Sequence, residues 1–241
     1  MRIKPRPTVG FDRFIRREWM DAALDLALAG EGPQTLRPWL AEQLSGQEAV
    51  RKTFNLLTNL WFGTYAETQD LRHQALALAQ HLPRDAWMVL HWGMALANFP
   101  FFRAVAQIIG RLGRLQSAFT RQEIHIRLQE RYSNQRTVQR AADWMIQSLV
   151  SWGLLATEET HLSLTPPRSV PDAATATWLI KAVLLDRPER RAYWQSLLQA
   201  PELFPWTLPE GLRAYIHRLP ELHFARTASG EEEVVWQESP T

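Results

Sequence analysis

Apolar residues recur at helical spacing through almost all of the chain before residue 152. Steps of three and four residues place these side chains on one face of a helix, and such a face has to be buried. Helix start and stop signals divide the pattern into separate segments. The sequence therefore predicts a mainly α protein in which several amphipathic helices share a hydrophobic core.

Residues 1–95 are predicted to form an N-terminal helical bundle domain. Gly30 is placed to end its first helix, and Pro83 suits the first turn of its last helix. Ser45 and Glu48 have the spacing of a capping box, in which each side chain satisfies a free amide of the other residue. The helices expected here cover about 11–29, 36–44, 46–61, 68–81 and 84–97.

Residues 96–168 are predicted to form a winged helix-turn-helix. Thr120 and Glu123 have the spacing of a second capping box, and Gly153 is placed to end the third helix. Alternating residues after Gly153 indicate a two-stranded wing. The elements expected here are helices at about 99–116, 120–131 and 135–152, then strands at about 154–156 and 161–164.

Arginine is concentrated in the middle of this segment. From Arg103 to Arg140 the chain has eight arginines and two acidic residues, so the local charge is about +6, whereas the whole chain has a formal net charge of +2. The guanidinium group offers five donors in a planar fork that suits phosphates and guanine edges. The segment is therefore predicted to bind double-stranded DNA.

The last helix of a helix-turn-helix points its N-terminal part at base edges in the major groove. The residues expected to read bases there are Asn134, Gln135, Arg136, Gln139 and Arg140. The residues expected to contact phosphates around them are Arg103, Arg111, Arg114, Arg121, Arg127 and Arg131. Glu158 and Glu159 at the tip of the predicted wing would repel phosphate, so only the base or flank of the wing is expected to reach the DNA backbone.

The remaining residues, 169–241, are predicted to form a C-terminal helical region that ends in a small β-hairpin. Residues 169–172 have the composition of a linker. The helices expected after it cover about 173–185, 188–198 and 209–219, and the strands of the hairpin cover about 222–225 and 234–236.

No other class of site is predicted. The chain has no cysteine, which excludes disulfides, thiolate metal sites and a cysteine nucleophile. His91 lies in an apolar helix, where a hydrogen-bonded core histidine is expected, and the glycines Gly110 and Gly113 lie inside a helix rather than in a phosphate-binding loop. We expect no catalysis, metal, cofactor or small-molecule substrate. Without a secretory signal or an apolar stretch of the roughly 20 residues that span a bilayer, the protein is expected to be cytoplasmic and free of the membrane.

The order of these features resembles the BrxA-type proteins, small helical DNA-binding accessory proteins of bacterial BREX (bacteriophage exclusion) defence systems. The features that carry the resemblance are a leading helix with acidic and aromatic residues near its start (11–19), Val-Arg-Lys-Thr-Phe (50–54) opening a helix that ends in Leu-Trp (60–61), an aromatic-rich helix leading to Phe-Phe-Arg (101–103), Arg-Thr-Val-Gln-Arg (136–140) continuing to Gly-Leu-Leu (153–155), and Glu-Leu-Phe-Pro (202–205). The chain departs from that pattern in a longer C-terminal region and in its 11 tryptophans.

The resemblance implies a non-catalytic DNA-binding partner, working with other subunits of a system that methylates host DNA and blocks phage. Two alternatives stay open. A winged helix can act as a protein-protein interaction adaptor, in which case its arginine-rich face is simply solvated. It can also be the DNA-binding part of a sequence-specific transcriptional regulator.

Overall fold

The structure is a computed structural model that describes residues 10–63, 65–132 and 136–237. Helices predominate over these residues, as the sequence predicts. The α-helices are α1 (Arg17–Leu28), α2 (Leu36–Gln43), α3 (Gln47–Trp61), α4 (Ala66–Ala79), α5 (Trp87–Asn98), α6 (Pro100–Leu115), α7 (Arg121–Gln129), α8 (Arg136–Ser151), α9 (Ala173–Leu184), α10 (Trp194–Leu198) and α11 (Leu212–Ile216). The 3-10 helices are η1 (Pro33–Thr35), η2 (Arg84–Ala86), η3 (Pro188–Arg190) and η4 (Pro201–Leu203). The strands are β1 (Phe119–Thr120), β2 (Leu155–Glu158), β3 (His161–Leu164), β4 (Arg168–Ser169), β5 (Arg191–Tyr193), β6 (Trp206–Thr207), β7 (Leu222–Arg226) and β8 (Glu232–Trp236).

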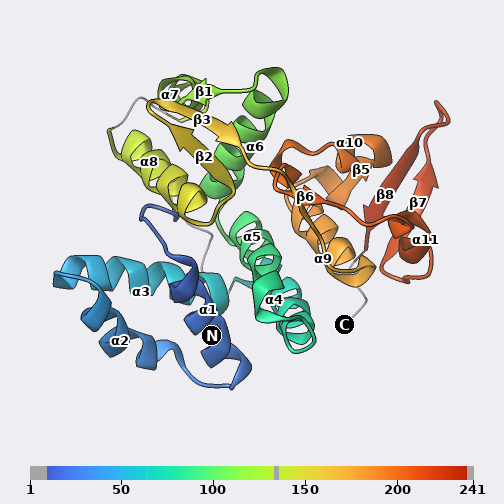
Figure 1. The fold of residues 1–241 in the computed structure, drawn as a ribbon. Helices are drawn as coiled ribbons and strands as arrows, with labels where there is room; N and C mark the ends of the chain where they lie inside the picture. The colour runs from blue at the N-terminus through green and yellow to red at the C-terminus, as the bar shows by residue number, and fades with distance from the viewer. Residues whose placement is uncertain (1–9, 64, 133–135, 238–241) are drawn as a thin grey trace.

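Helix α5 lies at the centre of the molecule, between the N-terminal helices and the rest of the chain (Figure 1). All 12 of its residues are buried. It packs against α3, α4, α6 and α9. A helix that is apolar on every side is stable only where neighbours surround it, and α5 therefore connects the packing of all three parts of the chain.

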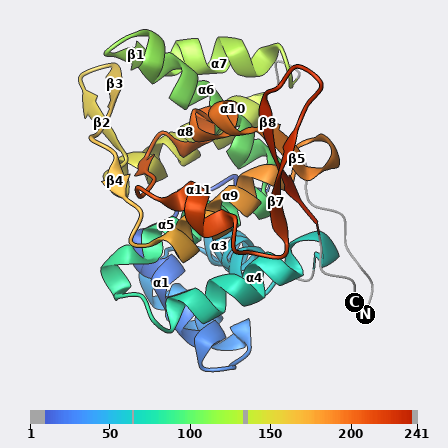
Figure 2. The same cartoon turned by 90° about the vertical axis from the view of Figure 1, so that its right-hand side faces the viewer.

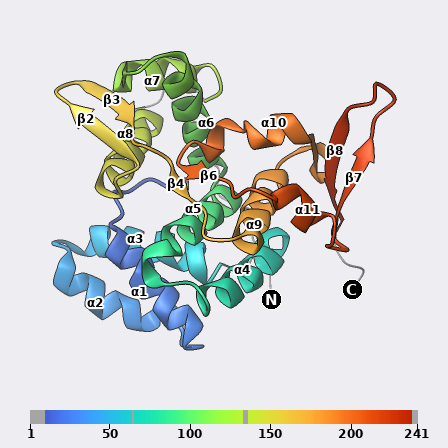
Figure 3. The same ribbon diagram turned by 45° about the vertical axis from the view of Figure 1, so that its right-hand side comes forward.

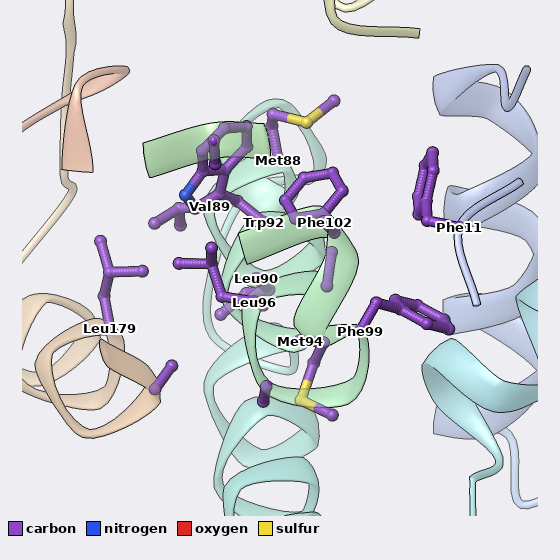
Figure 4. Packing of buried hydrophobic residues seen from close by; sticks show 14 of the residues in the cluster. Phe11, Met88, Val89, Leu90, Trp92, Met94, Leu96, Phe99, Phe102 and Leu179 are labelled. Carbon is purple, nitrogen blue, oxygen red and sulfur yellow. The ribbon is translucent and has the colours of Figure 1, made fainter. Parts of the chain in front are cut away.

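Aromatic side chains fill the core around α5 (Figure 4). The ring of Trp92 meets that of Phe102 with centroids 5.1 Å apart, and its Nε1 donates to the carbonyl of Glu202 at 3.0 Å. Phe11 reaches the same cluster from the N-terminal segment and meets Phe99 edge to face at 5.8 Å. Edge-to-face pairs stabilise a core beyond the area that they bury. Several of the tryptophans thus occupy the interior.

The first helix begins later than predicted. Residues 11–16 precede α1 in a non-helical segment, although Phe11 and Ile15 are fully buried. The amide of Ile15 donates to Ser148 Oγ at 2.9 Å, and its carbonyl accepts from Trp152 Nε1 at 2.9 Å. Because the C-terminal half of α8 and the residue that follows it satisfy these backbone groups, the segment is held in place without forming a helical turn.

Of the two predicted capping boxes, the one at Thr120 is confirmed and the one at Ser45 is wrong. Thr120 Oγ1 accepts from the amide of Glu123 at 3.3 Å, and a carboxylate oxygen of Glu123 accepts from the amide of Thr120 at 2.8 Å. At the start of α3 the N-cap is Gly46, with φ of 97°, and no side chain caps the helix. Glu48 is instead paired with Arg51 at 2.8 Å.

Residues 100–164 contain α6, β1, α7, α8, β2 and β3 in that order. The three strands form an antiparallel sheet in the order β1-β3-β2. The helices and the β2–β3 hairpin lie close to their predicted positions, whereas β1 was not predicted. Leu155 pairs with Leu164 at one end of the hairpin, and Glu158 pairs with His161 at its turn.

The C-terminal region is less helical than predicted. The expected helix at 188–198 is wrong, because its first half is η3 and β5 and only α10 is α-helical. Positive φ angles of 52° at Glu189 and Arg190 break the helical path, and β5 then pairs with β8. The expected helix at 209–219 shortens to α11. The terminal hairpin is confirmed as β7 and β8, within a three-stranded sheet ordered β5-β8-β7.

The β2–β3 hairpin and the β7–β8 hairpin project from opposite sides of the molecule (Figure 3). Residue 168, predicted as the last of the winged helix-turn-helix, and residue 169, predicted as the first of a linker, form β4, which pairs in parallel with β6. Within the described ranges, none of the helices combines the length and the apolar character that crossing a lipid bilayer requires.

Candidate nucleic-acid interface

Helix α8 presents one apolar face to the core and one polar face to solvent. Its buried side chains fall at steps of three and four and include Val138, Met145 and Leu149. Arg136 and Arg140 are exposed on the first turns, one helical turn apart, while Gln139 is partly buried. Neither arginine makes an ion pair with any residue that the structure describes. Asn134 and Gln135, also predicted to read bases, lie outside the described residues.

A carboxylate on α8 ties this helix to α7. Asp143 Oδ1 lies 3.1 Å from His125 Nε2 and 3.5 Å from Arg121 Nη1. The carboxylate can only accept, so His125 Nε2 carries the proton. Arg121, predicted to contact phosphate, is therefore partly neutralised by its neighbour, and both contacts join α7 to α8.

The sequence prediction for Arg103 is wrong. This residue was expected to contact phosphate, but it is only 6% exposed. Its guanidinium group donates to the carbonyls of Val183 at 3.0 Å and Ala182 at 2.6 Å, near the C-terminal end of α9. Its Nε lies 3.0 Å from a carboxylate oxygen of Asp186. Cations are stabilised by the free carbonyls of a helix C-terminus, so Arg103 holds α6 to α9 instead of facing solvent.

The other predicted phosphate contacts divide into two groups. Arg114 is exposed, and its guanidinium group donates to the carbonyl of Gln199 and, at 3.3 Å, to that of Ala200. Arg111, Arg127 and Arg131 line a groove between α6 and α7. The predicted phosphate contacts thus have different environments: one is buried, one is paired with Asp143, one is bonded to backbone carbonyls after α10, and three line the groove.

The hairpin that follows α8 carries acidic residues at its tip. Glu158 and Glu159 are both exposed, and Glu159 adopts a positive φ of 51° in the turn. The neighbouring His161 is exposed as well. The two carboxylates would repel a phosphate backbone, so of α8 and its hairpin only the start of α8 presents exposed arginines.

Metal-ligating side chains and the core histidine are the other groups with possible chemistry in the described part of the chain. No group of three or more histidine, aspartate or glutamate side chains there could hold a metal ion. His91 is a core residue: its Nδ1 accepts from Trp61 Nε1 at 3.1 Å, and its Nε2 lies 2.8 Å from Asp21 Oδ1. Both ring nitrogens are thus occupied, and this histidine serves the packing of α5 against α1 and α3.

The glycines inside α6 have a packing role. A Cβ added at Gly110 would lie 2.0 Å from the carbonyl oxygen of Pro201, and one at Gly113 would lie 2.3 Å from the side chain of Leu164. The first contact is to η4 and the second to β3. Glycine therefore permits two close approaches to α6, which explains this pair without a bound nucleotide.

Comparisons with protein-family models, with curated proteins and with solved structures gave no match to this chain.

Proposed function

We propose that residues 100–164 form a winged helix-turn-helix and that the start of α8 binds double-stranded DNA. The observation that carries this proposal is the order of elements: helix, short strand, helix, helix and hairpin, with the strands paired as β1-β3-β2. In helix-turn-helix proteins the last helix enters the major groove by its N-terminal residues. Arg136 and Arg140 occupy those positions here and are free of carboxylate partners among the described residues.

The electrostatics of α8 restrict how DNA could be bound. Residues four apart on a helix lie on the same side, so the guanidinium groups of Arg136 and Arg140 can enter one groove together. Arginine donates to O6 and N7 of guanine or to phosphate oxygens. Asp143 lies further along α8, and Glu158 and Glu159 lie at the tip of the adjacent hairpin. These carboxylates would repel phosphates and so confine the DNA to the first turns of α8.

The test is a DNA-binding titration with the variant Arg136→Ala/Arg140→Ala. Because each good arginine contact to a base is worth about 1–3 kcal/mol, we expect the affinity for duplex DNA to fall at least about tenfold. If both contacts are to phosphate, the slope of log K against log salt should become shallower by about 2. Affinity should be measured by fluorescence anisotropy over a salt series.

The matched control is Arg37→Ala/Arg218→Ala, which removes the same charge from two exposed positions, one on α2 and one after α11. We expect this control to bind DNA nearly as tightly as the unaltered protein. If the two double variants lose affinity equally, or if the unaltered protein binds no DNA at low salt, the assignment of α8 is wrong.

The proposed role is non-catalytic, as an accessory protein in a BREX-type defence system. This part of the proposal comes from the sequence resemblance alone. Its test is plaque formation by phage on cells that carry the complete system with the unaltered protein or with Arg136→Ala/Arg140→Ala. We expect the variant to lose protection at equal protein level. Equal protection would contradict a role of α8 in defence.

A transcriptional regulator differs from an accessory protein in sequence preference. A regulator favours its operator over random duplex by about 10³-fold or more. We expect a much smaller preference here, measured by selection from a random duplex library followed by titration of the enriched sequence. An enriched operator-like site would favour the regulator.

A further inference from the structure

A groove lies between α6 and α7. Figure 2 shows helix α7 at the top of the molecule, next to α6. The volume of the groove is about 590 Å³. The residues that line this α6–α7 groove are Ala104, Gln107, Ile108, Arg111 and Leu115 of α6, Ile126 and Arg127 of α7, and Glu130 and Arg131 just after it.

Large apolar side chains are exposed at this groove. Leu115 is 78% exposed and Ile126 is 48% exposed. Within the described ranges the other large apolar side chain of comparable exposure is Tyr193, at 41%, on β5. Single exposed apolar residues are common on protein surfaces, whereas two that line one concave surface give a partner apolar side chains to cover.

The same groove is positively charged. Arg111, Arg127 and Arg131 line it together with a single acidic residue, Glu130. None of the three arginines makes an ion pair with a residue that the structure describes. Arg127 donates to the backbone carbonyl of Glu123 at 3.2 Å, and Arg131 lies over the ring of Tyr132. The charge of Arg127 also acts on Glu123, whose pKa it helps to lower, and Arg111 and Arg131 are the arginines of the groove that face an acidic partner without a carboxylate paired with them among the described residues.

The groove lies away from the surface of α8 that carries Arg136 and Arg140. Arg121 and His125 contact Asp143 of α8 from one side of α7. At about 100° per residue, Arg127 projects from the other side of α7. A partner in the groove would therefore leave the start of α8 accessible.

We propose that the α6–α7 groove binds an amphipathic helix of another protein, with apolar residues on one face and acidic residues beside them. The apolar side chains at Leu115 and Ile126 favour a helix over a nucleic-acid backbone, which has no apolar stripe to cover them. A helix-in-groove contact uses apolar anchors at positions i, i+3 or i+4, and i+7, and its specificity comes from charges on the rim. Two copies of this chain placed groove to groove would bring arginines against arginines.

The probe is a synthetic peptide held helical by a side-chain cross-link, with Leu at i, i+3 and i+7 and Glu on both flanks. A second peptide carries Lys in place of Glu. We expect the Glu peptide to bind the full-length protein at least about tenfold more tightly than the Lys peptide in fluorescence anisotropy. The variant Leu115→Ser/Ile126→Ser should weaken this binding at least about tenfold, whereas the matched control Tyr193→Ser should leave it unchanged.

A charge exchange tests the role of the arginines directly. In the variant Arg111→Glu/Arg127→Glu we expect the preference to reverse, so that the Lys peptide binds more tightly than the Glu peptide. A reversal of this kind cannot result from unfolding, since an unfolded variant would bind neither peptide. Circular dichroism of each variant checks the fold independently.

Three outcomes would overturn the proposal. The first is no binding of the Glu peptide up to about 1 mM, or binding that does not depend on Leu115 and Ile126. The second is displacement of the peptide by duplex DNA, which would make the groove a nucleic-acid surface. The third is a dimer in light scattering that Leu115→Ser/Ile126→Ser dissociates, which would make the occupant a second copy. The peptide should bind Arg136→Ala/Arg140→Ala normally, so failure of DNA binding and failure of this inference are distinguishable.

Discussion

Arg103 and Arg111 lie two turns apart on α6 and have opposite environments. Arg103 is buried against the last carbonyls of α9 and against Asp186, and one of its nitrogens lies 3.8 Å from the fully buried carboxylate of Glu202. Arg111 is exposed at the α6–α7 groove. A buried cation that is paired and hydrogen-bonded leaves uncompensated charge and acceptors behind when it is removed. The two residues should therefore respond very differently to truncation.

We predict that Arg103→Ala lowers the free energy of unfolding by about 3–5 kcal/mol, because Glu202 and the end of α9 lose a buried partner. Arg111→Ala should change it by no more than about 0.5 kcal/mol, as expected for an exposed side chain. Urea unfolding followed by circular dichroism measures both. Equal effects of the two substitutions would contradict the structural role assigned to Arg103.

His91 is a residue whose burial has a consequence for stability. Burial lowers its pKa below the ordinary value, although the hydrogen bond to Asp21 acts in the opposite direction. The Nδ1 atom accepts from the indole of Trp61, which can only donate, so a second proton on the ring would break that hydrogen bond. The folded protein therefore keeps His91 neutral at pH values where the unfolded chain takes up a proton.

The sign of the pH dependence follows from proton uptake. Since the unfolded state binds the extra proton, the stabilisation is complete above the unfolded pKa of about 6.5 and is lost as the pH falls below it. We predict that the free energy of unfolding falls by up to ~1.4 kcal/mol per pH unit in that range. The variant His91→Gln should have a shallower dependence, whereas His161→Gln, at an exposed position, should not. Urea titrations between about pH 5 and 8 would contradict the prediction if all three proteins had the same slope.

At the scale of the element, the start of α7 has the best-defined local signal in the chain. Thr120 and Glu123 exchange hydrogen bonds between side chain and backbone. The carboxylate of Glu123 also accepts from the side chain of Gln116 at 2.8 Å, and this hydrogen bond, followed by that from the amide of Thr120, lowers the pKa of Glu123. The cap thus fixes both the start of α7 and the connection from α6.

We predict that Thr120→Ala lowers the free energy of unfolding by about 1 kcal/mol, because the amide of Glu123 loses its acceptor. Ser45→Ala is the control, since the start of α3 has Gly46 as its N-cap and no capping side chain. It should have an effect within about 0.5 kcal/mol. Thermal unfolding by circular dichroism compares the two variants, and an equal loss at Ser45 would mean that the side chain caps α3 after all.

The elements that the sequence predicts well are those whose signals are local. The apolar face of α8 and the capping box of α7 depend on residues within a few positions of each other. Strands β1 and β5 could not be predicted in this way, because Phe119 pairs with Leu162 and Ala192 pairs with Val234, far along the chain. The same limit applies to the candidate site: whether Arg103 faces solvent depends on where α9 ends.

At the scale of the whole molecule, the predicted winged helix-turn-helix is not surrounded by solvent. The N-terminal half of α6 is buried on nearly all sides, and Gly110 allows the carbonyl of Pro201 in η4 to approach it closely. The segment before α1 is bonded to α8 and to the residue after it through Ile15. Residues from the N-terminal, middle and C-terminal parts belong to one hydrophobic cluster.

This continuity predicts that the segment 99–168 does not fold stably when it is expressed alone. Removing the rest of the chain would expose Phe102 and Trp152, which now pack on Phe11, and would leave the guanidinium group of Arg103 without the carbonyls of α9. Each large buried side chain that becomes exposed costs about 1.5–3 kcal/mol, so a few such losses equal the whole stability of a domain of this size. We expect the full chain to unfold cooperatively, with tryptophan fluorescence and circular dichroism changing together, and the segment to show no cooperative thermal transition. A segment that melts cooperatively near the transition of the full chain would instead indicate an autonomous domain, which could then be tested for DNA binding by itself.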